Sequence, residues 1–350
     1  MMRVALDTNA LYTTRAGVAR YVRGMQQGLA TLRDADLHVI PWVWTVENFD
    51  YAQPQRLLKT AWREGVWART TGRVRLRSVD LLHSTHLPLL ARPSVPQVVT
   101  LHDLAVLRHP ERFRAWQRHS GVRRLRQLAG ADRIIAVSQF TADEAIALLG
   151  LSARRISVVH HGVTLAEAEE VPAELPAEFF LFVGSLEPGK NLALLRQVWL
   201  AAAAEGKTLP PLLIVGSRWA GVAREGEAPV GWRFLGYQPD EVLLALYRRA
   251  RALLFPSVYE GFGLPVLEAM AAGCPVICGR VASLPEVGGD AVNYAALNVT
   301  GFLAAARHML SGDALRMGLI AAGRARAALF NWETCARATA AVYRQTLARA

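Results

Sequence analysis

The stretch that decides the fold runs from residue 256 to residue 277 and reads Pro-Ser-Val-Tyr-Glu-Gly-Phe-Gly-Leu-Pro-Val-Leu-Glu-Ala-Met-Ala-Ala-Gly-Cys-Pro-Val-Ile. It predicts the end of a strand, a turn through Gly261 and Gly263, and a helix that opens at Pro265, because proline suits the first helical position. Glycine lets a backbone turn sharply and approach a ligand closely. The N–H groups of Phe262, Gly263 and Leu264 would then hold an anion such as a diphosphate.

Two carboxylates flank this turn, Glu260 before it and Glu268 in the helix after it. Carboxylates are poor partners for phosphate but accept hydrogen bonds from hydroxyl groups. We therefore expect Glu260 to face the sugar of a nucleotide sugar and Glu268 to face the ribose. The alternative for Glu268 is that it complements the helix dipole from the first turn.

Residues 256–277 resemble, almost position by position, the carboxylate-pair signature of retaining glycosyltransferase family 4 (glycosyltransferase group 1), which includes many bacterial mannosyltransferases. The resemblance is dense from about residue 180 to 295 and patchy over the first 165 residues. It implies the α/β fold called GT-B, in which two Rossmann-like, doubly wound domains face a central cleft.

The alternation of apolar runs with helix-like segments independently predicts parallel, doubly wound sheets. Strands are expected near residues 3–7, 98–101 and 133–137, and again near 179–184, 212–216, 252–255 and 275–278. The domains are predicted as an acceptor-binding domain over 1–165, an acidic linker over 166–178 and a nucleotide-sugar-binding domain over 179–330. The resemblance implies that the last helix, 331–350, crosses back onto the first domain.

The run Gly-Ser-Leu-Glu-Pro-Gly-Lys-Asn (184–191) follows a predicted buried strand and precedes a helix. Lys190 would place a point charge on a phosphate, although a solvated lysine in a turn is the plainer interpretation. The resemblance implies that Lys190 contacts the donor diphosphate. Many family members carry an arginine where this chain has Ser185, which leaves Ser185 a single neutral hydrogen bond to donate.

Three further positions complete the predicted site. His102 ends the 98–101 strand, where it could donate to a sugar hydroxyl with Asp103 fixing its orientation, or where the His-Asp pair could simply cap the next helix. The resemblance implies that His102 faces the donor sugar. Gly17 precedes a helix and would bring backbone N–H groups to the diphosphate or the acceptor. Gly236 and Tyr237 end a strand, at a turn that borders the nucleobase in the resembled family.

We predict no metal and no other cofactor. His160 and His161 invite a metal interpretation, but neighbouring residues of a strand point to opposite faces. No Asp-x-Asp pair stands near a plausible diphosphate site. The three cysteines have no disulfide or metal spacing, and the start of the chain is too short in apolar residues for a signal peptide. These features predict a cytoplasmic protein.

The net charge of +11 lies in the first half, with 23 Lys and Arg against 12 Asp and Glu through residue 165 and 17 against 17 after it. The arginines gather in residues 56–77 and 108–126. This pattern favours a surface for anionic phospholipid or a lipid-diphosphate acceptor over a mere genome bias, and no nucleic-acid module accompanies it. The protein would then sit peripherally on the inner face of the cytoplasmic membrane. The oligomeric state stays open.

Together these features predict a retaining hexosyltransferase that moves mannose from GDP-mannose to a glycan or lipid-linked acceptor in cell-surface polysaccharide assembly. Rhamnose, glucose or N-acetylglucosamine donors remain open. The alternatives are a sugar-nucleotide epimerase of the same architecture and a non-catalytic protein that binds sugar nucleotides or lipids.

Overall fold

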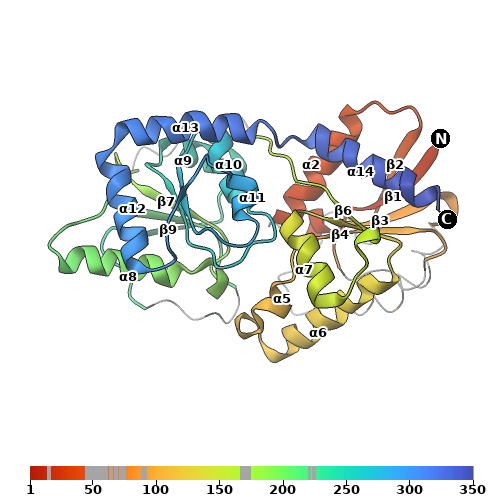
Figure 1. Cartoon of the computed structure of the whole chain (residues 1–350), viewed down its shortest axis with the longest axis horizontal. Coiled ribbons are helices and arrows are strands. Elements are labelled where there is room, and N and C mark those ends of the chain that lie inside the picture. Colours follow the sequence, from red (N-terminus) through yellow and green to blue (C-terminus); the bar gives the residue numbers. More distant parts are fainter. Residues whose placement is uncertain are drawn as a thin grey trace. The chain divides into compact units, whose positions relative to one another are not determined.

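The computed structural model describes residues 1–13, 17–43, 62, 66, 70, 76–87, 93–165, 175–219, 222 and 226–349. Residues 166–174 of the predicted linker (166–178), residues 14–16 before Gly17 and most of the arginine-rich stretch 56–77 lie outside these residues. The chain divides into two compact units, Met1–Gly162 with Asn331–Ala350, and Val163–Phe330. Each unit carries one sheet, as the ribbon in Figure 1 shows.

The sheet of the first unit is six-stranded and parallel, in the order β2-β1-β3-β4-β5-β6. Its strands are β1 (Met2–Asp7), β2 (Leu37–Trp42), β3 (Leu81–Ser84), β4 (Gln97–Leu101), β5 (Arg133–Ala136) and β6 (Ile156–Val158). The helices of this unit are α1 (Ala10–Thr13), α2 (Gly17–Thr31), α5 (Ala105–Arg108), α6 (Ala115–Arg126), α7 (Gln139–Leu149) and α14 (Trp332–Leu347).

Both faces of this sheet are buried, because successive strand residues enter different cores. Val98 packs in the cluster that includes α2 and α14, whereas its neighbour Val99 packs in the cluster next to α6 and α7. Ile135 and Ile134 alternate in the same way. This is the packing of a doubly wound sheet, so the predicted fold class is confirmed for this unit.

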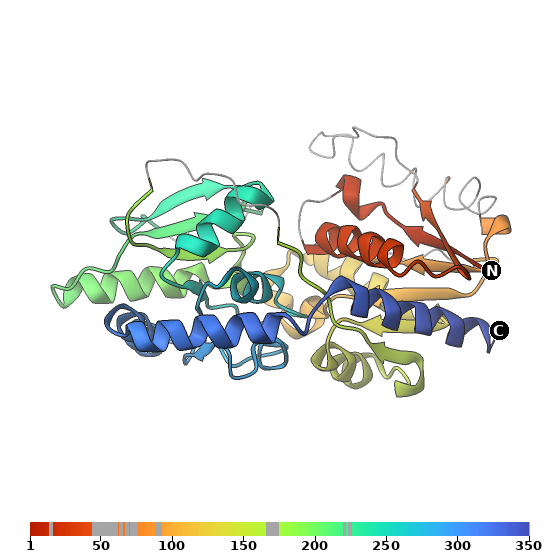
Figure 2. The ribbon, with the colours of Figure 1, turned by 90° about the horizontal axis from the view of Figure 1, so that it is seen from above.

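The C-terminal helix α14 packs along α2, and Figure 2 shows the two helices side by side. The close approach depends on glycine: a Cβ on Gly24 would lie 2.0 Å from Trp332 Cε2, and one on Gly28 would lie 2.3 Å from the Trp332 carbonyl oxygen. Trp332 therefore packs directly on the α2 backbone at Gly24 and Gly28, and a side chain at either glycine would clash with it.

The second sheet is also six-stranded and parallel, in the order β12-β11-β10-β7-β8-β9. Its strands are β7 (Phe180–Val183), β8 (Leu212–Val215), β9 (Arg233–Gly236), β10 (Leu253–Phe255), β11 (Val276–Cys278) and β12 (Asn293–Tyr294). The helices are α8 (Leu192–Ala204), α9 (Asp240–Arg249), α10 (Leu264–Ala272), α11 (Leu284–Gly288), α12 (Val299–Ser311) and α13 (Asp313–Ala327). Apolar side chains of α8 and α12 pack on one face of this sheet and form a core with the strand residues.

Candidate active site

The carboxyl ends of neighbouring strands in the second sheet bring the predicted donor residues to one edge. Gly236 ends β9 and Tyr237 follows it, Ser185 and Lys190 follow β7, and Glu260 follows β10. The strands β10, β7, β8 and β9 are adjacent in that order. This edge is where open parallel sheets bind nucleotides.

The loop after β7 is tied to the loop after β10. Asn191 adopts a left-handed conformation at φ 55°, and its Nδ2 donates to the Pro256 carbonyl at 3.3 Å. The Val258 amide donates to the Gly189 carbonyl at 3.0 Å. The buried Glu187 carboxylate accepts from the Gly189 amide at 2.7 Å and so shapes the short turn that ends in Lys190. These bonds fix Lys190 against the second loop.

Lys190 and Glu260 form an ion pair, and the two side chains are only 17% and 11% exposed. The Lys190 ammonium also lies 5.6 Å from the centre of the Phe255 ring. The plainer interpretation of Lys190 as a solvated turn residue is therefore wrong. A lysine held at this edge by a single carboxylate can exchange that partner for an anionic ligand, since a diphosphate carries more charge.

The turn between Glu260 and α10 has a conformation that requires glycine. Gly263 has φ +101°, and a Cβ there would lie 2.7 Å from Leu284 Cδ2. The buried Ser283 hydroxyl lies 2.9 Å from both the Glu260 and the Phe262 carbonyl oxygens, and its one hydrogen is donated to one of them or shared between the two. Gly261 and Phe262 are buried within this turn. The helix begins at Leu264, one residue before the predicted start. Pro265 has no amide hydrogen, and the Val266 and Leu267 amides donate to the Gly263 carbonyl at 3.0 and 3.3 Å, so any anion at this helix start would meet the amides of Gly263 and Leu264.

Glu268 is the fifth residue of α10, and the first turn of that helix has no acidic residue. The interpretation that Glu268 complements the helix dipole from the first turn is therefore wrong. Instead, the hydroxyl of Tyr247 on α9 donates to Glu268 Oε2 at 3.1 Å. Tyr247 is 2% exposed, so this bond comes from a fixed position. It orients a carboxylate that is itself only partly buried.

The remaining donor residues lie farther along the same edge. Ser185 is partly buried, and its carbonyl accepts from the Glu187 amide at 3.0 Å. Gly236 has φ +67° with open space where a Cβ would stand, and its carbonyl accepts from the Gly216 amide at 2.8 Å. The Tyr237 side chain is 46% exposed beside it. The edge therefore offers an aromatic surface at one end and the ion pair nearer the other.

In the first unit, His102 follows β4 at the carboxyl edge of that sheet. Its Nε2 lies 2.8 Å from the Thr85 carbonyl oxygen, which can only accept, so Nε2 carries the proton. Burial lowers the pKa of His102 to about 4. The imidazole is therefore neutral at pH 7 with an unprotonated Nδ1, and Nδ1 can accept a hydrogen bond from a hydroxyl. The predicted donation to a sugar hydroxyl does not fit this arrangement.

Asp103 does not orient His102. Its Oδ1 accepts from the Ala105 amide at 2.9 Å, an Asx turn that starts α5, so the capping alternative is correct for this residue. The ring of His102 is instead packed against Tyr21 at 5.1 Å and His161 at 5.6 Å between ring centres. Gly17 is the first residue of α2 and is exposed.

The strand expected around His160 and His161 ends earlier, at Val158. Beyond it, Gly162 packs against the backbone at the start of α14, where a Cβ would lie 2.3 Å from the Trp332 nitrogen. His161 is buried, and burial lowers its pKa well below the ordinary value. Over the described parts of the chain, no three His, Cys, Asp or Glu residues gather closely enough to hold a metal ion.

A buried hydrogen-bonded chain joins α14 to the rings around His102. The Tyr343 hydroxyl lies 2.6 Å from His83 Nδ1, His83 Nε2 lies 2.8 Å from the Thr100 hydroxyl, and that hydroxyl lies 2.8 Å from the Tyr21 hydroxyl. Burial lowers the pKa of His83 to about 3, so the chain is uncharged. The C-terminal helix thus helps to set the position of Tyr21.

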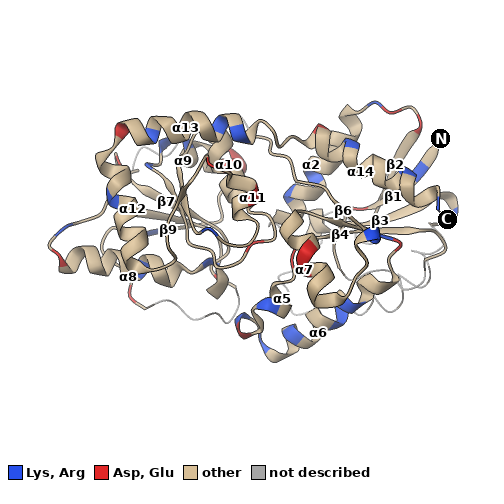
Figure 3. Ribbon diagram, in the orientation of Figure 1, with Lys and Arg blue, Asp and Glu red and all other residues tan. Residues whose placement is uncertain are grey.

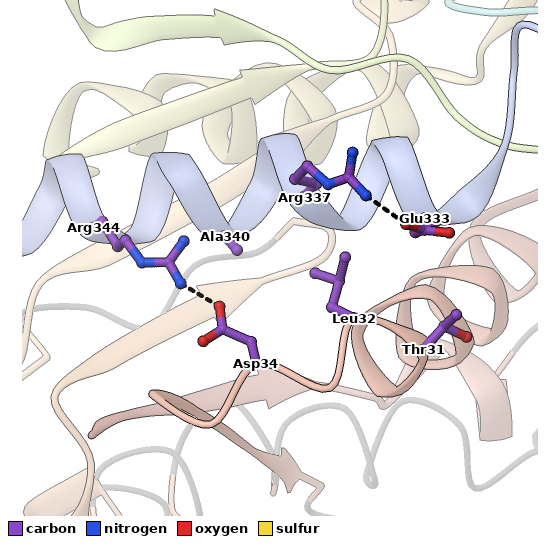
Figure 4. Close-up of a pocket in the computed structure, with 7 residues that line it drawn as sticks. All are labelled: Thr31, Leu32, Asp34, Glu333, Arg337, Ala340 and Arg344. Carbon is purple, nitrogen blue, oxygen red and sulfur yellow. Dashed lines mark hydrogen bonds and ion pairs between the residues drawn. The ribbon is translucent and has the colours of Figure 1, made fainter.

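A surface pocket elsewhere in this unit has no such role. Figure 4 shows it between α14 and the end of α2, with the ion pairs Arg344–Asp34 and Arg337–Glu333 along it. Asp34 precedes β2, so the pocket lies at the amino edge of the sheet, opposite His102. The Arg337–Glu333 pair lies within α14, and the Arg344–Asp34 pair ties α14 to the segment before β2.

Three residues that help to shape the site were given no role from the sequence, namely Thr85, Asn191 and Tyr247. Asn191 directly follows Lys190 and precedes a helix, and left-handed backbone favours asparagine, so it carried a local signal. The other two act through contacts far apart in the sequence, which no local pattern indicates.

Comparison with known proteins places these features in a family. The family described as "Glycosyl transferases group 1" matches residues 177–312, and "Glycosyltransferase Family 4" matches residues 15–167. O-antigen chain mannosyltransferase B of Escherichia coli is 36% identical over 273 residues, 71% of this chain and 70% of that protein. Glycogen synthase of Mycobacterium tuberculosis is 33% identical over 312 residues, 80% of this chain and 72% of that protein.

Among solved structures, sucrose-phosphate synthase from Thermosynechococcus elongatus superposes with a TM-score of 0.77 at 22% identity, covering 100% of both chains. That likeness confirms the GT-B fold. Together with the family matches and the mannosyltransferase relative, it establishes that the chain belongs to glycosyltransferase family 4.

Proposed function

We propose that this glycosyltransferase moves mannose from GDP-mannose to a glycan or lipid-linked acceptor, with retention of the anomeric configuration, in the assembly of cell-surface polysaccharide. The observation that carries the proposal is the Lys190–Glu260 ion pair beside the start of α10. The choice of mannose is supported by the 36% identity to an O-antigen mannosyltransferase.

The donor diphosphate would lie against the first amides of α10. The amides of Gly263 and Leu264 precede the first turn of that helix, and a helix start attracts negative charge. Lys190 would move from Glu260 to the diphosphate and neutralise the charge that develops as the sugar departs. Ser185 would donate one hydrogen bond to the same group. Because lysine and backbone amides supply this stabilisation, the proposal requires no metal ion.

The two carboxylates would then read hydroxyl groups on either side of the diphosphate. Glu260, released from Lys190, would accept from a hydroxyl of the donor sugar and hold the ring as positive charge develops. Glu268, oriented by Tyr247, would accept from the ribose. Gly236 and the half-exposed Tyr237 would border the nucleobase.

Retention would follow from attack on the face that the leaving phosphate occupies, with that phosphate taking the proton of the acceptor. In the first unit, the neutral His102 would accept a hydrogen bond from the donor sugar through Nδ1. Gly17 would present backbone near the acceptor. The three cysteines are buried and unpaired, which is consistent with the proposed cytoplasmic location.

The test has two steps. Thermal-shift measurements with GDP, UDP, ADP and dTDP identify the base, and GDP is expected to raise the melting temperature most. Transfer from labelled GDP-mannose is then followed by NMR of the product, which should show an α-linked mannose. Stabilisation by UDP alone, or an inverted linkage, would contradict the proposal. Conversion of the labelled sugar without acceptor would indicate an epimerase instead.

A further inference from the structure

The arginines of the second basic stretch do not all serve the same purpose. Residues 108–126 contain seven arginines and one acidic residue, Glu111. Arg108 is committed to Glu144 of α7, with the closest atoms 2.5 Å apart and the carboxylate 6% exposed. Figure 3 shows further basic positions along α6. The structure thus separates a structural arginine from those that the helix presents to solvent.

Helix α6 has a distinct inner and outer face. On the inner face a Cβ at Gly121 would lie 2.9 Å from Val106 Cγ2, and Leu125 is buried. Trp116, His119 and Arg123 are all exposed and follow the spacing i, i+3, i+7, which places them on one stripe. Arg126 is exposed three residues farther on. These four residues are the outer face of α6.

The outer face of α6 combines an exposed indole with exposed positive charge. The Trp116 side chain is 66% exposed, although burying an indole is strongly favourable. Tryptophan is enriched at the boundary of lipid headgroups and acyl chains, where one side of the ring is apolar and the other wet. Arginines beside it bind phosphate oxygens. The sequence from residue 112 to residue 131 has no acidic residue to oppose them.

We propose that the outer face of α6 docks on an anionic phospholipid surface, with Trp116 entering the headgroup region and Arg123 and Arg126 contacting lipid phosphates. Arginines in the last turn of α6 also complement the helix dipole. That role does not account for the exposed indole of Trp116 at the other end of the stripe. Among the described residues no helix is long and apolar enough to cross a membrane, so such docking would be peripheral. The inference does not depend on the donor site.

The experiment measures partitioning of the full chain onto vesicles of about one-third phosphatidylglycerol in phosphatidylcholine, by co-sedimentation at low salt. One basic side chain near an anionic surface strengthens partitioning about fivefold. The double variant Arg123→Gln/Arg126→Gln should therefore bind about thirtyfold more weakly. The matched control is Arg248→Gln/Arg249→Gln, which removes the same charge from the exposed last turn of α9. It should bind like the wild type.

Trp116→Ala tests the aromatic contribution separately and should weaken binding with little change in its salt dependence. GDP-induced thermal shifts are measured on every variant, since they report the donor site and the folded state independently of lipid. Equal binding of both double variants, or equal binding of the wild type to vesicles of phosphatidylcholine alone, would overturn the proposal. A loss of binding only in the α6 variants, with the GDP shift retained, supports it.

Discussion

Replacement of Glu260 by glutamine should separate binding of the nucleoside diphosphate from transfer of the sugar. In the structure the Glu260 carboxylate holds the Lys190 ammonium, and both side chains are largely buried. A diphosphate must take Lys190 away from this partner and then lie near a carboxylate of its own sign. The amide of glutamine keeps the shape and an acceptor oxygen of Glu260, but it removes the negative charge that holds Lys190 and repels the diphosphate.

The size of the effect follows from the charges. Two like charges about 5 to 6 Å apart repel by about 3 kcal/mol at an effective dielectric constant near 20. Solvent reaches part of this edge, so we take about half of that value, which corresponds to about tenfold tighter binding of GDP by Glu260→Gln. Transfer should fall by about a hundredfold or more, because a neutral amide stabilises the developing positive charge of the sugar less well.

Calorimetric titration with GDP and a transfer assay with GDP-mannose measure the two effects. The control is Glu205→Gln, which breaks the Arg307–Glu205 pair of 2.6 Å in the same unit. Glu205 follows the other end of α8, about 20 Å of helix away from Lys190, and its replacement should change neither quantity. Weaker GDP binding by Glu260→Gln together with normal transfer would refute the reasoning.

Three further predictions concern the ribose, pH and the C-terminal helix. Glu268→Gln should weaken GDP about tenfold, the loss expected for hydrogen bonds to a charged group, and leave inhibition by pyrophosphate unchanged, as competition assays would show. Burial lowers the pKa values of His83, His102 and His161, so below pH 6.5 the unfolded chain binds more protons than the folded one. The free energy of unfolding should therefore fall by up to about 1.4 kcal/mol per histidine per pH unit between pH 6.5 and their lowered pKa values, as denaturant unfolding would show. Gly24→Ala should lower the melting temperature because the new Cβ meets Trp332, although alanine normally stabilises a helix by about 1 kcal/mol.

Each of these has a result that counts against it. A parallel loss of pyrophosphate inhibition would mean that Glu268 acts on the diphosphate loop and not on the ribose. Constant stability from pH 7 to pH 5 would mean that the histidines are not held neutral. The control for Gly24 is Gly318→Ala on α13, where the space around the Cβ is open, and this change should raise the melting temperature. A rise for both variants would contradict the packing of α14.

The sequence predicts local elements well where one residue type has a single structural use. Serine before a helix is one such case: Ser138 directly precedes α7, and its Oγ accepts from the Thr141 amide at 3.0 Å. The turn before α10 is also confirmed, because only glycine tolerates φ +101° beside Leu284. Lys190 and Glu260 follow the carboxyl ends of parallel strands, as the βα alternation predicts. That β7 and β10 are neighbours is a finding of the structure.

Contacts between distant residues account for what the sequence could not indicate. Asp103 and His102 are neighbours, yet the Thr85 carbonyl orients the histidine and Asp103 serves α5. Tyr247 lies on α9 and Glu268 on α10, with β10 between the two helices, so no local sequence pattern joins them. In each case the packing of strands and helices determines the hydrogen-bond partner, and no local pattern in a single sequence predicts that partner.

The central claim is that the donor diphosphate binds at the start of α10, held by Lys190, with Glu260 and Glu268 on either side. A crystal structure of the protein soaked with GDP-mannose tests it most directly. The account predicts diphosphate oxygens within hydrogen-bond distance of the Lys190 ammonium and the first amides of α10, with the Lys190–Glu260 pair broken. A ligand bound elsewhere, with that ion pair intact, would contradict it.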